Sequence, residues 1–225
     1  MIQPNNSSVA SNQRGIHPRL RQTLQRHLDT PYQRPFPPFS SDVFEALEHI
    51  LSNHSELLIL DAGCGTGMST VRLALRFPRA TVIGIDKSET KLSKNLWKRL
   101  GQLPRNCFLL RGTIEDVWRW LVQHKILIHY HLLWYPNPWP KSRHIKRRWH
   151  GHPAFPFLFQ CSLCVELRTN WKIYAQEFAL AATDITGSTP EITAFSPITP
   201  LTPFERKYAR RGESLYKVRW YATDR

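Results

Sequence analysis

Short apolar stretches alternate with amphipathic stretches along most of this chain. A continuous apolar run such as residues 57–61 is typical of a strand that is buried on both faces of a parallel sheet. Apolar residues spaced three and four apart, as in residues 69–77, instead favour a helix. We predict strands at residues 57–61, 81–86, 107–111, 126–135 and 162–168, and helices that begin at Ser41 or span residues 69–77, 89–100, 114–123 and 170–182.

The regular alternation of these elements predicts the fold class. A strand, a helix and a second parallel strand form the repeating unit of α/β proteins, so we expect a doubly wound, mostly parallel sheet. Two later strands, at residues 191–195 and 214–221, are expected to pair antiparallel at its edge. The sequence therefore predicts a seven-stranded sheet within a single domain at residues 42–225.

Residues 1–41 differ from the rest of the chain in composition. They are rich in Pro, Ser and Arg, and they hold Arg14, Arg19, Arg21, Arg26 and Arg34 against a single acid, Asp29. A segment with so little apolar surface does not fold alone. We expect a basic, flexible N-terminal arm. It is either a passive tail or, as its charge favours, an arm that closes over phosphates.

The charge of the whole chain also favours binding to phosphates. Lys and Arg outnumber Asp and Glu by 31 to 17, which gives a net charge of +14. Such an excess favours a polyanionic partner, and nucleic acid is the leading candidate. The alternative is a basic protein without a specific anionic partner. No apolar run is long enough to cross a bilayer and the N-terminus has no signal core, so we expect a cytoplasmic protein without a membrane partner.

The four cysteines show no disulfide framework and are expected to be free thiols. Cys161 and Cys164 form a C-x-x-C pair downstream of His150 and His152, which makes a zinc site conceivable. However, residues 161–169 have the pattern of a buried strand, whose alternation would place the two cysteines on opposite faces. Core packing is the better interpretation, and we expect no metal.

The strongest local motif is Asp61-Ala62-Gly63-Cys64-Gly65-Thr66-Gly67, between a predicted strand and a predicted helix. Gly63, Gly65 and Gly67 allow a close approach of ligand to backbone, and a helix N-terminus offers free N–H groups. Glycine loops also bind dinucleotides, but the G-x-G-x-x-G spacing is absent. A tight turn without a ligand is the other alternative.

The first two predicted strands each end in an acid, Asp61 and Asp86, and these acids favour a ligand other than a dinucleotide. The carboxylate of Asp86 is placed to accept hydrogen bonds from both hydroxyls of a ribose. This layout is similar to motif I of the Rossmann-like class I methyltransferases, which bind S-adenosylmethionine. After the third strand, Thr113 and Asp116 are candidates for a contact with the adenine. Asp116 is equally well explained as an acid in the first turn of a helix.

The fourth predicted strand ends in a proline-rich loop, residues 135–141. Ligands of open α/β sheets bind beyond the carboxyl ends of the strands, so the methyl acceptor is expected here, where prolines hold the loop rigid. Trp139 offers a stacking face for a base, or is a core residue beneath a surface turn. A basic run follows that is typical of a phosphate-binding strip, or of a solvated face: Lys141, Arg143, His144, Lys146, Arg147 and Arg148.

Residues 136–148 resemble the tRNA (guanine-N7)-methyltransferase family, whose pattern is Pro-Asp-Pro-Trp followed by Lys-x-x-His-x-Lys-Arg-Arg. Thr169-Asn170-Trp171, with Tyr174 beyond, is similar to that family's Thr-Asp-x-x-x-Tyr. Residues 202–206 resemble its Thr-x-Phe-Glu, and Gly212 follows in the expected region. The resemblance covers roughly residues 56–221.

The resemblance implies methyl transfer from S-adenosylmethionine to N7 of a guanosine in the tRNA variable loop, at guanosine 46. Asn137 would be the catalytic position and would also contact the cofactor, with Asp61, Asp86, the three loop glycines and Thr113. The target guanine and tRNA would be bound by the basic run and by Asn170, Thr202, Pro203, Phe204 and Glu205. Guanine N7 carries a free lone pair at neutral pH, so positioning rather than a strong base would limit the rate.

Three positions depart from the family pattern. Asn137 and Asn170 replace acids that could accept hydrogen bonds from the guanine edge, and an amide accepts more weakly. Thr113 stands where an acid is common. These departures leave two alternatives open: methylation of an exocyclic amine, since residues 137–139 faintly resemble the Asn-Pro-Pro-aromatic motif, or a non-catalytic RNA-binding protein. The pattern does not set the oligomeric state, although a monomer is slightly favoured.

Overall fold

The computed structural model describes residues 9–30, 32–53 and 57–223 of the 225-residue chain. Its centre is one sheet of seven strands in the order β3-β2-β1-β4-β5-β7-β6. The first five strands are parallel, and β6 and β7 are antiparallel to their neighbours. The strands are β1 (Leu58–Ala62), β2 (Thr81–Asp86), β3 (Cys107–Arg111), β4 (Tyr130–Trp134), β5 (Cys164–Thr169), β6 (Glu191–Phe195) and β7 (Leu215–Tyr221).

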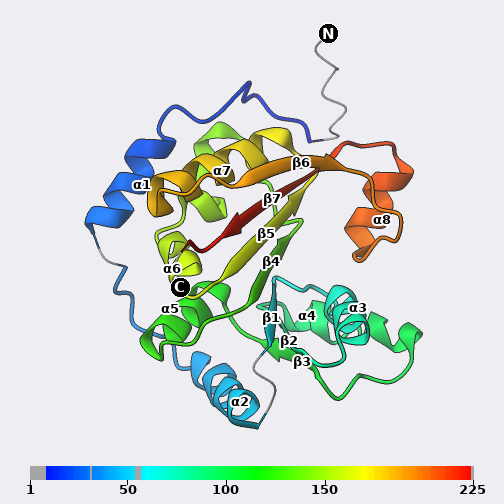
Figure 1. Cartoon of the computed structure of the whole chain (residues 1–225). Coiled ribbons are helices and arrows are strands. Elements are labelled where there is room, and N and C mark those ends of the chain that lie inside the picture. The colour runs from blue at the N-terminus through cyan, green and yellow to red at the C-terminus, as the bar shows by residue number, and fades with distance from the viewer. Residues whose placement is uncertain (1–8, 31, 54–56, 224–225) are drawn as a thin grey trace.

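The predicted fold class is thus confirmed, including the antiparallel pair at the edge (Figure 1). The strand order along the sheet reverses direction between β1 and β4, and ligands of open α/β sheets bind at such a switch point. The helices are α1 (Leu20–Asp29), α2 (Ser40–Asn53), α3 (Met68–Arg76), α4 (Glu89–Leu92), α5 (Ile114–Gln123), α6 (Phe155–Gln160), α7 (Lys172–Thr186) and α8 (Pro203–Arg210), with 3-10 turns η1 (Leu96–Leu100), η2 (Ser142–Arg147) and η3 (Trp149–Gly151).

Each face of the sheet carries its own apolar core, because successive side chains of a strand point to opposite faces. On one face, Leu58 and Leu60 pack with α2, α5, α6 and α7 in the larger core. On the other face, Ile59 packs with α3 in a smaller core. The two layers of helices hold the strand ends in fixed positions, and these ends carry the candidate site.

Several predicted boundaries were wrong, and four of them are informative. The helix expected at residues 89–100 is broken into α4 and η1 by Asn95, which has a left-handed φ of 45°, and neither piece has a buried residue to hold a longer helix. The strand expected at residues 126–135 is only β4, with an isolated bridge at Ile128. Cys161 ends α6 rather than beginning β5. Helix α2 begins at Ser40, not at Ser41.

The N-terminal segment includes a helix that the sequence pattern did not predict. Helix α1 packs against α7 and buries Leu20 and Leu24, each 1% exposed. Its remaining positions are mostly polar, so the apolar stripe is too narrow to stand out in the sequence. That residues 1–41 form a flexible arm which does not fold alone stays a prediction.

Among the residues that the structure describes, no helix combines the length and the apolar character that crossing a membrane requires.

Candidate active site

The glycine loop between β1 and α3 forms an open cradle. Gly63, Gly65 and Gly67 have φ values of 81°, 62° and 75°, which favour glycine because a Cβ would strain this backbone. A Cβ on Gly63 or Gly65 would meet no atom within 4 Å, so free space lies over the loop. A Cβ on Gly67 would come within 2.7 Å of Leu109. The first two glycines therefore face the cradle, and the third allows close packing.

Asp61 braces this loop from beneath. Its carboxylate is buried, and its Oδ2 accepts hydrogen bonds from the hydroxyls of Ser69 at 2.6 Å and Thr70 at 2.7 Å. Burial raises the pKa of Asp61, and the two hydroxyl donors oppose that shift. The side chain thus ties the end of β1 to the first turn of α3.

Asp86 closes the cradle at the end of β2. Its Oδ2 accepts the Gly65 N–H at 2.9 Å, and its Oδ1 accepts the Ser88 N–H at 2.8 Å. The ammonium of Lys91 lies 3.5 Å from Oδ2. A carboxylate oxygen accepts more than one hydrogen bond, so Asp86 retains capacity for hydroxyl donors of a ligand.

A cavity of about 570 Å³ opens on this side of the sheet. It is lined by Phe39, Asp42, Val43, Lys87 and residues 109–113. Thr113 lines the cavity and donates to Asp116 at 2.5 Å, while Asp116 also accepts from Ser40 at 3.1 Å. Asp116 is buried and acts as a brace between α2 and α5, so of the two candidates only Thr113 lines the cavity.

These observations fit an adenosyl cofactor. The open cradle over Gly63 and Gly65 has room for the amino-acid end of the cofactor close to the backbone, and the carboxylate of Asp86 suits a ribose. The cavity beside Thr113 has an apolar wall, Leu109 and Leu110, that suits a purine.

The acceptor loop, residues 135–141, follows β4 and adopts a strained backbone. Tyr135 and Trp139 have φ values of 54° and 45°, a region that non-glycine residues rarely occupy. Asn137 is exposed, and its Oδ1 accepts the Trp139 N–H at 3.3 Å. The guanidinium of Arg147 lies 4.8 Å from the centre of the half-buried Trp139 ring. The amide oxygen of Asn137 is thus already engaged within the loop.

The basic run after this loop divides into exposed and buried members. Lys141, Arg143, Lys146 and Arg147 are exposed, and His144 is half-buried. Arg148 is 0% exposed and pairs with Glu177 of α7 at 2.5 Å. The prediction that Arg148 contacts phosphate is therefore corrected. In the 3-10 geometry of η2, positions three apart share a face, so Arg148 follows the buried Ile145 into the interior.

Asn170 lies at the end of β5 beside an acid that the sequence analysis missed. Its Nδ2 donates to Glu213 Oε2 at 2.8 Å, and both side chains are buried. The other oxygen of Glu213 is buried without a hydrogen-bond partner among the described residues. The site therefore has a carboxylate, that of Glu213, next to position 170, although residue 170 itself carries an amide side chain.

Residues 202–205 form the N-terminus of α8. The hydroxyl of the N-cap residue Thr202 accepts the Glu205 N–H at 2.9 Å, as in a capping box, while Glu205 accepts the N–H of Leu201, one residue before the cap, at 2.7 Å. The buried Glu205 also accepts from Arg168 at 2.8 Å and Tyr135 at 3.1 Å. Thr202 and Glu205 are buried, while Pro203 and Phe204 are exposed.

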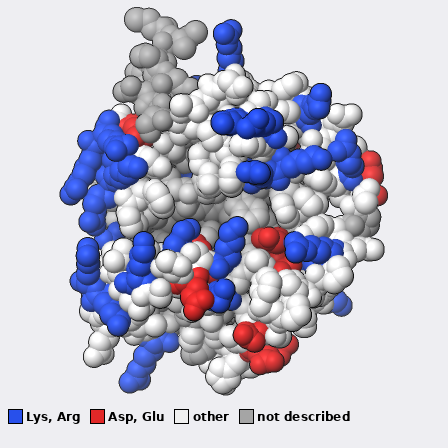
Figure 2. Space-filling view, turned by 180° about the vertical axis from the view of Figure 1, so that it is seen from behind, with Lys and Arg blue, Asp and Glu red and all other residues white. Residues whose placement is uncertain are grey.

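The exposed charge on this molecule is dominated by cations. Figure 2 shows a face on which Lys and Arg side chains stand on both sides of a hollow, with fewer Asp and Glu side chains. Within the described residues, no cluster of His, Cys, Asp and Glu is arranged to hold a metal ion. All four cysteines are buried free thiols.

The strand order, the glycine cradle and the acid at the end of β2 together define a class I methyltransferase. Comparison with known proteins agrees: a family model described as "Putative methyltransferase" matches residues 55–218, and the chain belongs to that family.

Curated relatives carry a more specific name. A tRNA (guanine-N(7)-)-methyltransferase of Treponema pallidum is 28% identical over 169 residues, which cover 72% of this chain and 65% of the relative. This chain therefore matches somewhat less than two thirds of that protein's length. A protein of the same name from Mycobacterium avium is 27% identical over 199 residues, covering 83% of this chain and 72% of the relative.

Solved structures share the fold at low sequence identity. A 16S rRNA methyltransferase, KamB, superposes with a TM-score of 0.58 at 12% identity, covering 86% of this chain and 97% of that one. An antibiotic-related methyltransferase gives a TM-score of 0.56 at 14% identity, covering 85% and 97%. At these identities the likeness establishes the fold alone.

Proposed function

We propose that this protein transfers a methyl group from S-adenosylmethionine to N7 of a guanosine in tRNA. The observation that carries the proposal is that the glycine cradle and the acceptor loop follow neighbouring strands, β1 and β4, and that exposed Lys141, Arg143, Lys146 and Arg147 continue from the loop. The names of the curated relatives support the base and the RNA class. The proposal includes guanosine 46 of the variable loop as the target, which is the position that the family resemblance implies.

The cradle residues would hold the cofactor. Asp86 would accept the ribose hydroxyls, Gly63 and Gly65 would allow the amino-acid end to lie on the backbone, and Thr113 would border the adenine. When bound, S-adenosylmethionine supplies a methyl group on a positively charged sulfur, and its transfer to N7 requires no proton to leave the base. The protein's contribution is then to orient the guanine and exclude water, which suits a site without a general base.

The exposed aromatic and cationic groups would bind the RNA. Phe204 is 52% exposed and offers a stacking surface at the start of α8. Lys141, Lys146 and Arg147 would neutralise phosphates of the RNA.

A carboxylate for the guanine edge would come from Glu213 rather than from residue 170. Its Oε1 accepts no hydrogen bond among the described residues and lies 3.9 Å from a terminal nitrogen of Arg211, so it is a suitable acceptor for the base N1–H or amine once the site opens. An exocyclic amine as target has less support, because the curated relatives are named for methylation at guanine N7.

The pairing of Asn170 with Glu213 gives a direct test of this assignment. The Asn170→Asp variant restores the family residue but places two carboxylates at hydrogen-bond distance, which disfavours their joint ionisation. We expect the methylation rate at pH 8 to fall about tenfold, equivalent to ~1.4 kcal/mol, and the double variant Asn170→Asp with Glu213→Gln to recover most of it. An Asn170→Asp variant as active as the wild type would remove Glu213 from the site.

The function itself is tested by incubating the protein with labelled S-adenosylmethionine and bulk tRNA and identifying the product by nucleoside mass spectrometry. The proposal predicts 7-methylguanosine, formed once per tRNA molecule and lost when the variable-loop guanosine is replaced. A different methylated nucleoside would assign another target. No product, despite measurable cofactor binding, would favour a non-catalytic RNA-binding protein.

A further inference from the structure

The buried Arg148 links the acceptor loop to the protein interior. Its guanidinium donates from Nε at 3.2 Å and from a terminal nitrogen at 3.1 Å to the Trp139 carbonyl. Its other terminal nitrogen pairs with Glu177, which also accepts from His150 Nε2 at 2.9 Å. The guanidinium stacks over Trp171 at 4.8 Å. This cation is therefore fully used within the protein.

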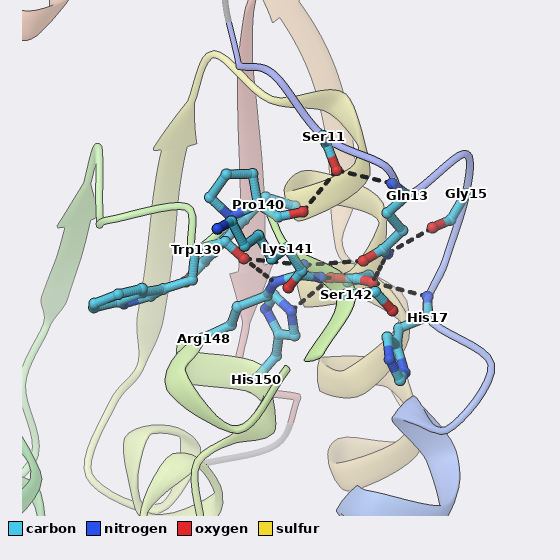
Figure 3. Close-up of polar contacts among 12 residues, drawn as sticks. Ser11, Gln13, Gly15, His17, Trp139, Pro140, Lys141, Ser142, Arg148 and His150 are labelled. Carbon is cyan, nitrogen blue, oxygen red and sulfur yellow. Dashed lines mark hydrogen bonds and ion pairs between the residues drawn. The ribbon is translucent and has the colours of Figure 1, made fainter. Parts of the chain in front are cut away.

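An N-terminal segment, residues 11–17, closes this network from outside, and we name it the strap. Figure 3 shows Ser11 of the strap reaching Pro140 of the acceptor loop and Gln13 lying beside the side chain of Arg148. The Ser11 hydroxyl donates to the Pro140 carbonyl at 2.7 Å. Gln13 accepts from Arg148 at 2.9 Å and donates to Glu177 at 2.5 Å. The His17 N–H also donates to Glu177, at 2.8 Å.

The network holds the acceptor loop at Trp139, where the backbone is strained. Trp139 is a non-glycine residue with a left-handed φ of 45°, a conformation that persists only when its surroundings fix it. Two guanidinium hydrogen bonds hold the carbonyl of Trp139, and Ser11 holds the next carbonyl along the chain. The contacts thus supply the restraint that the strained backbone needs.

We infer that Arg148 and the strap are positioning elements that fix the acceptor loop for methyl transfer, and that Arg148 does not bind RNA. The inference rests on the proposed function of the loop. Transfer to N7 depends on the alignment of the base rather than on a proton acceptor, so a displaced loop lowers the transfer rate more than it lowers binding. A basic N-terminus would thereby serve the active site through hydrogen bonds, not through its charge.

Arg148→Lys is the sharpest variant in the full-length protein. Lysine keeps the positive charge, but its compact ammonium cannot donate to Trp139, Glu177 and Gln13 at the same time, as the planar guanidinium of arginine does. We expect the single-turnover rate at saturating tRNA to fall at least tenfold. S-adenosylmethionine affinity by calorimetry should stay within twofold, and the salt dependence of tRNA binding should stay unchanged. Arg105→Lys, at an exposed arginine before β3, is the matched control and should keep the wild-type rate.

Gln13→Ala provides a second variant on the partly exposed strap, in case Arg148→Lys does not fold. It removes two contacts of the network without leaving an unpaired buried charge, and we expect a three- to tenfold slower transfer. Hydrogen exchange of amides in residues 139–142 should accelerate in both variants. In Arg148→Gln, which removes the charge, a salt slope reduced by about one unit would instead make Arg148 a phosphate contact and overturn the inference.

The exchange measurement separates this inference from the proposed function. If the wild-type protein methylates no tRNA, the proposed function fails. The inference then stands or falls on whether residues 139–142 exchange faster in Arg148→Lys and Gln13→Ala than in the wild type. Unchanged exchange and unchanged transfer rates in both variants would refute it.

Discussion

The two halves of the candidate site are built in different ways. The cofactor half, residues 61–67, 86 and 109–113, is joined by contacts close in sequence: Asp61 to Ser69 spans 8 residues and Gly65 to Asp86 spans 21. The acceptor half, residues 135–148 with the strap and Glu177, is joined across the whole chain. Arg148 to Gln13 spans 135 residues, and Gln13 to Glu177 spans 164.

The halves also differ in what holds them. Glycine conformations and backbone N–H donors shape the cofactor half, and its cavity remains open to a ligand. A buried ion pair and its hydrogen bonds hold the acceptor half closed around a strained loop. The cofactor half should therefore tolerate single changes with a local loss of binding, whereas the acceptor half should lose stability and turnover together.

Removing the central acid of the acceptor half should have the largest effect. Glu177→Ala leaves the Arg148 charge buried without its partner, and breaking a buried pair in this way costs about 3–5 kcal/mol. Urea unfolding should show this loss. The control is Asp184→Ala, which breaks an ion pair with Arg21 whose side chains are 26% and 71% exposed and should change stability by less than about 1 kcal/mol. Equal losses of unfolding free energy in the two variants would show that the buried pair contributes no more stability than the exposed pair.

The same acid predicts a pH dependence of stability. Burial alone would raise the pKa of Glu177, but the hydrogen bond from His150 and the charge of Arg148 outweigh it and lower the pKa from 4.5 to about 2. A lowered pKa contributes stability that is complete above about pH 4.5 and is lost as the pH falls toward 2, by about 3 kcal/mol in total.

Glu177→Gln isolates that contribution. The stability advantage of the wild type over this variant should be constant from pH 8 to 5 and should shrink below pH 4.5, when both proteins are unfolded in urea at each pH. A constant difference down to pH 3 would show that Glu177 has an ordinary pKa.

In the cofactor half, Asp86→Ala should weaken binding without unfolding the protein. Loss of hydrogen bonds to a charged group corresponds to about 1.5–3 kcal/mol, or roughly a 10- to 100-fold lower affinity for S-adenosylmethionine by calorimetry. Affinity for tRNA should remain near that of the wild type. Unchanged cofactor affinity would remove Asp86 from the pocket.

The smallest effect on stability is expected from the exposed cations of the acceptor half. Lys146→Ala with Arg147→Ala should reduce the slope of log affinity for tRNA against log salt by about 1.4–1.8, because each phosphate contact contributes roughly 0.7–0.9. The matched control is Lys98→Ala with Arg99→Ala, an equal loss of charge from η1 beyond the site. Equal slopes for the two double variants would mean that only net charge matters.

The sequence was sufficient for the cofactor half because its signals are local. A buried strand, a glycine loop and an acid at the next strand end occur within 29 residues, 58–86, and their predicted order matches the structure. The fold class followed from the same periodicity. Helix α8 could also have been predicted, since Thr202, Pro203 and Glu205 form a recognisable capping sequence.

The acceptor half could not be predicted to the same extent. Arg147 and Arg148 are adjacent and chemically identical, and only the 3-10 geometry of η2 places one outside and the other inside. A signal did exist on the other partner: Glu177 stands among the buried residues Tyr174 and Phe178 of α7, where an acid requires a buried cation. Its partner, 29 residues away, was not evident without the structure.

Hydrogen exchange of the free and cofactor-bound protein tests most directly that the two halves are distinct. The account predicts that S-adenosylmethionine slows exchange in residues 61–67, 86–88 and 109–113. Amides of residues 139–148 should exchange slowly already in the free protein and change little. Fast exchange in residues 139–148 that slows only when S-adenosylmethionine binds would contradict a preformed acceptor half held by Arg148 and the strap.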